Sequence, residues 1–261
     1  MKKEFVKDRN RSYDFVAGLL IIYMVFCHIM QWSKLVDTNV YVLLQRVLFF
    51  FMPWFFFKSG IYAHHDVDIK RYFSKNFKQL ILPAIYFSLL GLPCVWITLR
   101  LNGDDNIIHY TLSLVKQFLQ GSIPGNLPLW FLITLFEVKL SYVILRKFIS
   151  CEAILILAIV SVLLLTHFDL HRPISLFAVF TAMIFYSAGN ILASKENDFR
   201  CFVPCAILYF ASVMFYPQMV DLRTSTLIYG NYFVWILVSI AACVIINKLA
   251  ALICGGQILY A

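Results

Sequence analysis

Charge is scarce in this chain. Only 14% of its 261 residues are charged, whereas an ordinary soluble domain has about 25%. Hydrophobic residues make up 61% of the sequence, and the mean hydropathy is +0.80. These values exclude a water-soluble fold. They predict an all-α fold, a polytopic transmembrane helical bundle with little mass outside the membrane.

Several other features are missing. The seven cysteines include no CxxC pair and no His/Cys spacing suited to zinc, so we expect packing residues rather than a disulfide framework or a metal site. The first apolar run has no small-x-small cleavage site and is expected to stay as a span. We find no repeat, low-complexity tract or linker. Residues 1–261 are therefore expected to form a single transmembrane domain.

Apolar runs bounded by charged or turn residues predict about eight spans. Their ranges are 14–32, 41–63, 80–100, 127–147, 153–168, 174–193, 201–217 and 230–247. A ninth span is expected to begin near Leu249, at the C-terminus. The segment 105–126 contains apolar residues between two polar stretches, and we expect it to lie in the outer interface as an amphipathic helix.

The net charge of +8 follows the loops. Most lysines and arginines lie in alternate connections, which are the inner ones if the N-terminus is cytoplasmic. This bias predicts a multi-pass protein of the inner or plasma membrane with its N-terminus inside. It also accounts for the basic charge without nucleic acid, which would require a basic stripe on a soluble surface.

Two ionisable residues in the first span share a helix face. His28 follows Asp14 by fourteen residues, close to four turns of 3.6 residues, so both project from the same side. Imidazole is suited to proton transfer near neutral pH, and His28 is a candidate general base. The alternative is a packing histidine that is hydrogen-bonded to a neighbouring helix, and the spacing does not separate the two.

These residues open a series of motifs. The series runs from Asp14 through Gly18 to His28, then Met52-Pro53-Trp54 to Ser59-Gly60, then a basic loop before Pro83, then Pro128-Leu129-Trp130-Phe131-Leu132. In this order the motifs resemble the acyltransferase 3 family of integral membrane O-acyltransferases over roughly residues 9–140. The later run Phe185 to Asn190 is similar to the Tyr-x-x-Gly span of that family.

The resemblance implies transfer of an acyl group from acyl-CoA, usually acetyl-CoA, to a hydroxyl of a cell-envelope glycan or lipid-linked sugar, without a metal. His28 matches the family's catalytic histidine, which assists deprotonation of the acceptor hydroxyl or relays the acyl group. Asp14 would orient a partner. The remaining expected roles are donor-phosphate binding by Arg71, Lys75 and Lys78, and lining of the substrate cavity by Ser59, Trp130 and Lys58. Positive-inside anchoring is the alternative for the first set, and helix packing for Ser59 and Trp130.

Two departures from the family are evident. Family members commonly have Arg or Lys where this chain has Ala17, so another cation must supply the charge or activity is lost; Arg11, Arg46 and Lys58 are the candidates. The chain also ends about two helices earlier than the family does, and we expect a C-terminally truncated member. A polytopic glycan or lipid transporter, or an inactive remnant of an acyltransferase, are the alternatives.

Other polar groups give weaker predictions. His167, Asp169 and His171 alternate in an outer loop, where a solvated loop is favoured over a metal site. Glu137 and Lys139 are only two residues apart in the fourth span, so they point to different faces. Glu137 is therefore hypothesised to pair with an embedded cation such as Arg46 or Lys58.

Overall fold

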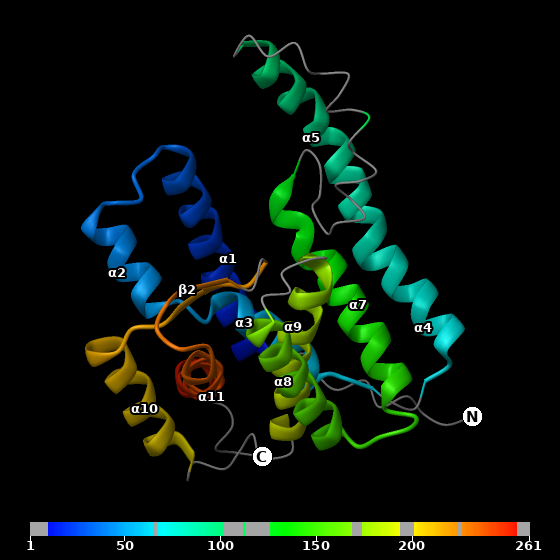
Figure 1. Cartoon of the computed structure of the whole chain (residues 1–261), viewed down its shortest axis with the longest axis vertical. Coiled ribbons are helices and arrows are strands. Elements are labelled where there is room, and N and C mark those ends of the chain that lie inside the picture. Colours follow the sequence, from blue (N-terminus) through cyan, green and yellow to red (C-terminus); the bar gives the residue numbers. More distant parts are fainter. Residues whose placement is uncertain are drawn as a thin grey trace. The chain divides into compact units, whose positions relative to one another are not determined.

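The computed structural model describes residues 10–64, 67–101, 112, 126–168, 174–193, 201–223 and 226–254. The chain consists of two compact units. Unit 1 comprises Met1–Tyr62, Ala188–Asp221 and Leu227–Ala261, and unit 2 comprises Ala63–Ser187 and Leu222–Thr226. Both are built mainly of helices (Figure 1). The prediction that the chain is a single domain stays a prediction.

Unit 1 is organised around its last helix. Its elements are α1 (Arg11–Trp32), α2 (Asn39–Val47), α3 (Phe51–Ile61), α10 (Phe202–Phe215), β1 (Met219–Asp221), most of β2 (Thr226–Tyr229) and α11 (Tyr232–Cys254). Helix α11 packs against α1, α3 and α10, and Figure 1 shows it nearly end-on beside α10. Small buried residues such as Ala242 and Cys243 let its neighbours approach, while Trp235 fills the space between them.

The second predicted span of unit 1 is interrupted. The range 41–63 forms two helices, α2 and α3, which are separated at residues 48–50. Pro53 lies in the first turn of α3, where its missing N–H leaves no helical bond unmade. A helix that continued backwards from Pro53 would bring the pyrrolidine ring against the carbonyl of Phe49, so α3 begins afresh at Phe51.

A short hairpin that the sequence analysis did not predict precedes α11. Strands β1 and β2 form a two-stranded sheet. Gln218 is fully buried beside it; its Nε2 donates to the carbonyl of Tyr216 at 2.9 Å and its Oε1 accepts from the backbone N–H of Asn231 at 2.7 Å. The Asn231 side chain in turn accepts from two backbone N–H groups of the first turn of α11, and so caps that helix.

Unit 2 contains a long helical stretch and the helices packed on it. Its elements are α4 (Ile69–Asn76), the π-helix η1 (Phe77–Ile81), α5 (Leu82–Leu101), the 3₁₀ turn η2 (Leu127–Leu129), α7 (Trp130–Leu145), α8 (Cys151–His167) and most of α9 (Ile174–Leu192). Pro83 explains the π-turn: it has no N–H for the carbonyl of Gln79, and the N–H of Leu82 bonds instead to the carbonyl of Phe77. Helix α7 packs against α4 and η1.

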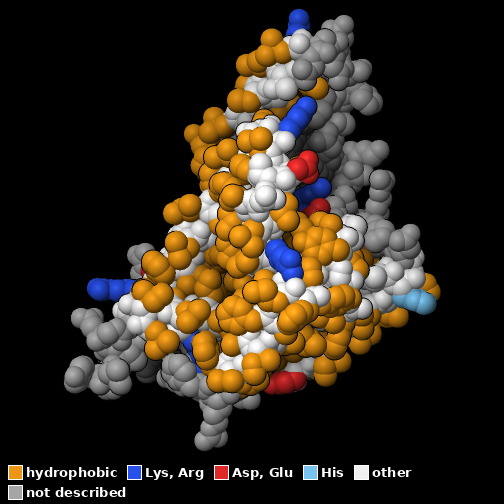
Figure 2. Space-filling model, turned by 90° about the vertical axis from the view of Figure 1, so that its left-hand side faces the viewer, with side chains coloured by type: hydrophobic (Ala, Val, Ile, Leu, Met, Phe, Trp, Pro, Cys, Tyr) orange, Lys and Arg blue, Asp and Glu red, His pale blue; other side chains and the backbone are white. Residues whose placement is uncertain are grey.

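Four helical stretches are long and apolar enough to cross a membrane. They are Arg11–Trp32, Asn39–Ile61, Ile69–Leu101 and Tyr232–Cys254. Large apolar side chains also lie exposed on α1, α5, α8 and α10, including Ile22, Leu89, Ile156 and Phe210. Hydrophobic side chains dominate the face shown in Figure 2, with few charges among them. Apolar surface of this extent is typical of association with a lipid bilayer.

Every range predicted as a span contains a helix. Three details were wrong. The range 41–63 is two helices, the third helical stretch begins at Ile69 rather than near residue 80, and Leu249 lies inside α11 rather than at the start of a ninth helix. The count of eight spans stays a prediction, and the expected interfacial segment 105–126 lies almost wholly outside the described residues.

Candidate functional site

The candidate site begins on one edge of α1. Asn10 caps this helix, with its side chain accepting a 2.9 Å bond from the N–H of Ser12. The cap puts Asp14 in the first turn, where a carboxylate is favoured by the helix dipole. A stripe from Tyr13 to Cys27 is buried, and Asp14 and His28 each follow a residue of that stripe, so both lie along its edge and both are half-buried.

Asp14 and His28 share this edge but not a site. The fourteen residues between them rise about 1.5 Å each, which separates the two side chains by about 21 Å along the axis. Neither can contact the other. The shared face predicted from the spacing is correct, and Asp14 must act on some other residue.

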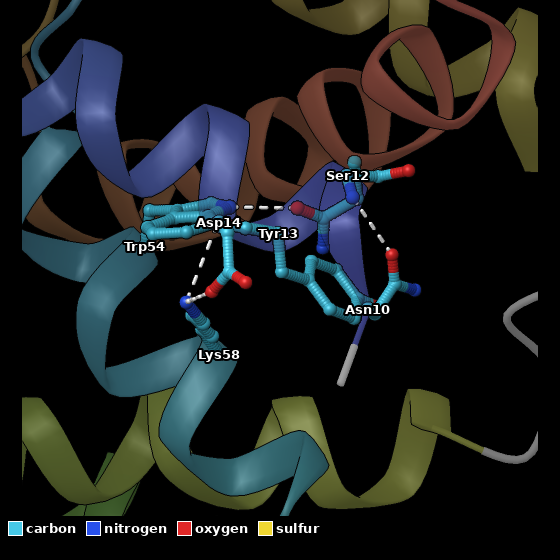
Figure 3. Close-up of polar contacts among 7 residues, drawn as sticks. Asn10, Ser12, Tyr13, Asp14, Trp54 and Lys58 are labelled. Atoms are coloured by element: carbon cyan, nitrogen blue, oxygen red, sulfur yellow. Dashed lines mark hydrogen bonds and ion pairs between the residues drawn. The ribbon is translucent and has the colours of Figure 1, made fainter. Parts of the chain in front are cut away.

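That other residue is Lys58. Its Nζ lies 3.8 Å from Oδ1 of Asp14 and donates a hydrogen bond of 3.3 Å to the carbonyl of Tyr13. Figure 3 shows the lysine of α3 reaching across to the first turn of α1. The Lys58 side chain is 23% exposed and that of Asp14 is 38% exposed. Solvent therefore screens part of the attraction between the two charges.

Trp54 packs against the lysine. It lies one turn earlier on α3, is fully buried, and presents its ring 5.4 Å from Nζ of Lys58. Its indole Nε1 donates a 2.7 Å hydrogen bond to Oδ1 of Asn247, a buried residue of α11. Three helices, α1, α3 and α11, therefore fix the position of one cation.

Tyr62 also lies near Asp14. It follows the last residue of α3, outside the candidate span, and its ring meets that of Tyr13 edge to face with centroids 5.9 Å apart. Burial, and to a lesser degree the charge of Asp14, raise the pKa of its hydroxyl above the usual value. Tyr62 is therefore uncharged at neutral pH beside the ion pair.

A second contact joins α3 to the end of α9. A Cβ on Gly189 would lie 2.1 Å from the backbone oxygen of Phe57, so only glycine allows this approach. Nδ2 of Asn190 donates a 3.3 Å hydrogen bond to the carbonyl of Gly60. The Met-Pro-aromatic motif and the end of the later run, Gly189-Asn190, thus meet in unit 1.

The hydrogen bonds near His28 join other residues. Nε2 of Gln45 donates to the thiol of Cys27 at 3.3 Å and to the hydroxyl of Tyr41 at 3.1 Å, and Gln31 donates to the same hydroxyl. None of these bonds includes the imidazole, and within the described ranges we find no hydrogen bond to His28. The packing alternative requires a hydrogen bond from His28 to a neighbouring helix, and the described residues provide none.

The other cations considered for the place of Ala17 lie elsewhere. Arg46 donates to the carbonyls of Val213 and Met214 at the end of α10, where a cation satisfies unpaired carbonyls. Arg11 is exposed. Lys58 reaches Asp14. Glu137 belongs to unit 2, whereas Arg46 and Lys58 belong to unit 1, so its pairing with either cation stays a prediction.

The remaining predicted residues belong to different units. Ser59 is half-buried in α3 of unit 1, while Trp130 begins α7 of unit 2 and packs edge to face on Phe131. A cavity shared by the two stays a prediction. The basic set Arg71, Lys75 and Lys78 is exposed on α4 and η1 of unit 2, as either anchoring or phosphate binding requires.

No group of three metal-ligating side chains occurs among the described residues. His167 ends α8 against Phe168, whereas Asp169 and His171 lie outside the described residues. Sequence reasoning missed Trp54 and Asn247 as partners. The signal was present: an asparagine within an apolar span has to find a polar partner.

Comparisons with known proteins add no relative. No family model matches this chain, and neither a curated protein nor a solved structure matches it significantly.

Proposed function

We propose that the protein is a membrane-bound O-acyltransferase that moves an acyl group, usually acetyl, from acyl-CoA to a hydroxyl of a cell-envelope or exported polysaccharide. It would lie in the inner membrane with a cytoplasmic N-terminus and about eight spans. The donor would approach from the cytoplasm, and the acceptor would be a glycan or lipid-linked sugar.

One observation carries the proposal. Lys58 pairs with Asp14 at 3.8 Å, and this pair joins the first two motifs of the resemblance. Family members commonly carry a cation at the position of Ala17, one turn after Asp14 on α1. A lysine from α3 therefore brings a positive charge within one turn of the position where this chain lacks it, which is the compensation that activity without that cation would need.

His28 would perform the chemistry. Its imidazole would accept the proton of the acceptor hydroxyl while that oxygen attacks the thioester carbonyl. The resulting tetrahedral intermediate would collapse with loss of the coenzyme A thiolate, and the imidazolium would return its proton to that sulfur. An imidazole without a hydrogen bond to another described residue leaves a ring nitrogen for the acceptor.

Lys58 would act as a positioning residue in this scheme. A cation at the level of Asp14 lies about 21 Å along α1 from His28 and cannot touch an oxyanion formed there. It would set the angle between α1 and α3 and present a positive charge near the N-terminal end of the span, the side from which an anionic donor would enter.

The test is incorporation of radiolabelled acetyl groups from acetyl-CoA into envelope polysaccharide, in membrane vesicles that contain the protein. We expect His28→Ala to abolish incorporation at unchanged protein level. His64→Ala is the matched control, because His64 is exposed between α3 and α4 and has no role in the scheme. Equal incorporation by both variants and the wild type would overturn the assignment of His28.

A glycan or lipid transporter is the second candidate, and the break between α2 and α3 favours it. Discontinuous helices within a span are typical of transporter binding sites, and this span is interrupted at residues 48–50. Binding of acetyl-CoA by the purified protein in detergent separates the two functions. Acyl transfer requires such binding, whereas a transporter without chemistry does not.

A further inference from the structure

Among the described residues, one lysine of unit 2 has no carboxylate partner. Nζ of Lys139, on α7, lies 3.2 Å from Oδ1 of Asn76 at the end of α4. The lysine is half-buried and the asparagine is only 4% exposed. An ammonium group has three N–H donors, and this bond is the one that Lys139 makes with the described residues.

The orientation of the Asn76 amide is determined by its own helix. Its Nδ2 donates a 2.9 Å hydrogen bond to the carbonyl of Tyr72 one turn earlier. The amide oxygen must then point away from α4, toward α7 and Lys139. Asn76 can therefore receive one ammonium N–H, but it contributes no charge to balance the lysine.

The charges around Lys139 make the imbalance larger. The nearby ammonium of Lys75 acts on that of Lys139 through space, which is repulsion between like charges. Glu137 is two residues away on α7, and its Oε2 is buried without a hydrogen bond. Within the described ranges no carboxylate pairs with Lys139 or Lys75. A half-buried cation next to a second cation costs free energy, and an anion bound between them would lower that cost.

Aromatic side chains at the same helix contact would strengthen the binding of an anion. Phe73 and Phe136 meet edge to face at 5.4 Å, and Phe77 stacks on Phe73 at 5.8 Å, so aromatic rings line the contact between α4, η1 and α7. A low local dielectric strengthens the attraction between an anion and these ammonium groups.

We propose that Lys139 and Lys75, with Asn76 as the oriented acceptor, form a binding site for a phosphate-class anion where α4 and α7 pack in unit 2. The phosphate belongs either to an anionic phospholipid headgroup or to a soluble phosphorylated ligand. The site shares Lys75 with the basic set that the resemblance implies for donor binding. It does not depend on acyl transfer, because phosphate binding is measured without donor or acceptor.

Two probes distinguish the sources of the phosphate. Pyrophosphate is titrated into the purified protein in neutral detergent at constant ionic strength, with heat of binding as the readout. Retention of phosphatidylglycerol against phosphatidylcholine is measured by native mass spectrometry after reconstitution with both lipids. Binding of pyrophosphate indicates a soluble ligand, and selective retention of phosphatidylglycerol alone indicates a lipid headgroup.

The variants test the residues. Lys139→Gln should weaken binding of the active probe about tenfold or more, the usual effect of losing a hydrogen bond to a charged group, and Lys139→Arg should retain it. Lys147→Gln is the matched control, since Lys147 is exposed just beyond α7 and should behave like the wild type. Circular dichroism and gel filtration check that each variant is folded.

Three results would overturn the proposal. They are absence of binding of either probe to the wild type, equal loss in Lys139→Gln and Lys147→Gln, or no loss in Lys139→Gln. If Lys139→Gln does not fold, Lys75→Gln replaces it, because Lys75 is exposed and the same tenfold loss is expected there. Unchanged binding by a folded Lys75→Gln variant contradicts the site.

Discussion

Gly189 is the residue whose replacement has the clearest physical consequence. Its Cβ position lies 2.1 Å from the Phe57 carbonyl oxygen and 2.9 Å from the carbonyl carbon. These are backbone atoms, which cannot rotate away as a side chain can. Gly189→Ala must push α9 from α3, and we expect about 1–3 kcal/mol of destabilisation, as for other overpacked contacts, measured by thermal unfolding in detergent.

Gly18→Ala is the matched control for that prediction. Gly18 also lies inside a helix, but apart from its chain neighbours and the backbone of its own helix, no atom comes within 4 Å of its Cβ position. Alanine favours helix over glycine by about 1 kcal/mol, so this variant should be neutral or slightly more stable. Equal destabilisation by the two substitutions would show that the close approach of α9 to Phe57 is not present in the folded protein.

Lys58 and Asp14 should contribute unequally to stability although they form one pair. Asp14 is 38% exposed, and an exposed ion pair contributes about 0–1 kcal/mol, so Asp14→Asn should have a small effect. Lys58→Met should cost more, because Lys58 also bonds to the carbonyl of Tyr13 and lies over Trp54. The free energies of unfolding of both variants test this asymmetry, and equal losses would contradict it.

The candidate site was partly readable from the sequence. Asp14, His28 and Lys58 are ionisable groups within apolar runs. Burying such a group in a membrane span costs several kcal/mol, so each of them is rare enough to be recognised singly in the sequence. Which of them meet is a different matter. The pairing of Lys58 with Asp14, and of Trp54 with Asn247, depends on how α1, α3 and α11 pack, and no local pattern encodes that arrangement.

At the scale of elements, the bond between Trp54 and Asn247 ties α3 to α11. Asn247→Leu would leave the indole N–H buried without an acceptor, which costs about 1–3 kcal/mol. Trp54→Phe should also destabilise the protein, because it leaves the amide of Asn247 without that donor. The double variant should lose less than the sum of the single losses, since no polar group of the pair is then left unpaired. Chemical unfolding in detergent measures all three, and strict additivity would show that the two side chains do not interact.

The helices themselves were largely predictable because hydropathy is a local property. Each predicted range contains a helix, but the ends and interruptions depend on single residues. The break at residues 48–50 was missed because Leu48, Phe49 and Phe50 are as apolar as their neighbours, and only the ring of Pro53 stops the helix. The start of α4 at Ile69 was missed because its basic residues were interpreted as loop. The hairpin before α11 was missed because three- and four-residue strands leave no periodic pattern.

At the scale of the whole molecule, the exposed apolar surface and the scarcity of charge have one explanation. Side chains such as Ile22, Val25 and Ile29 lie on the side of α1 opposite its buried stripe. In water this surface would favour aggregation, whereas in lipid it requires no cover. The same applies to α8 and α10, which are apolar but shorter than the four long stretches. The topology therefore depends on whether these shorter helices also cross the membrane.

The side of the membrane on which Lys147 lies distinguishes an eight-span topology from a four-span one. With the N-terminus inside, both topologies put Asp37, between α1 and α2, outside. If all eight helical segments cross, α7 returns the chain to the cytoplasm and Lys147 lies inside; if only the four long stretches cross, Lys147 stays outside. We therefore expect Asp37→Cys, but not Lys147→Cys, to react with a membrane-impermeant maleimide on intact cells, in a variant without the seven native cysteines. Lys147→Cys should react after lysis, and its labelling on intact cells would contradict the eight-span topology and the cytoplasmic position of the inner basic loops.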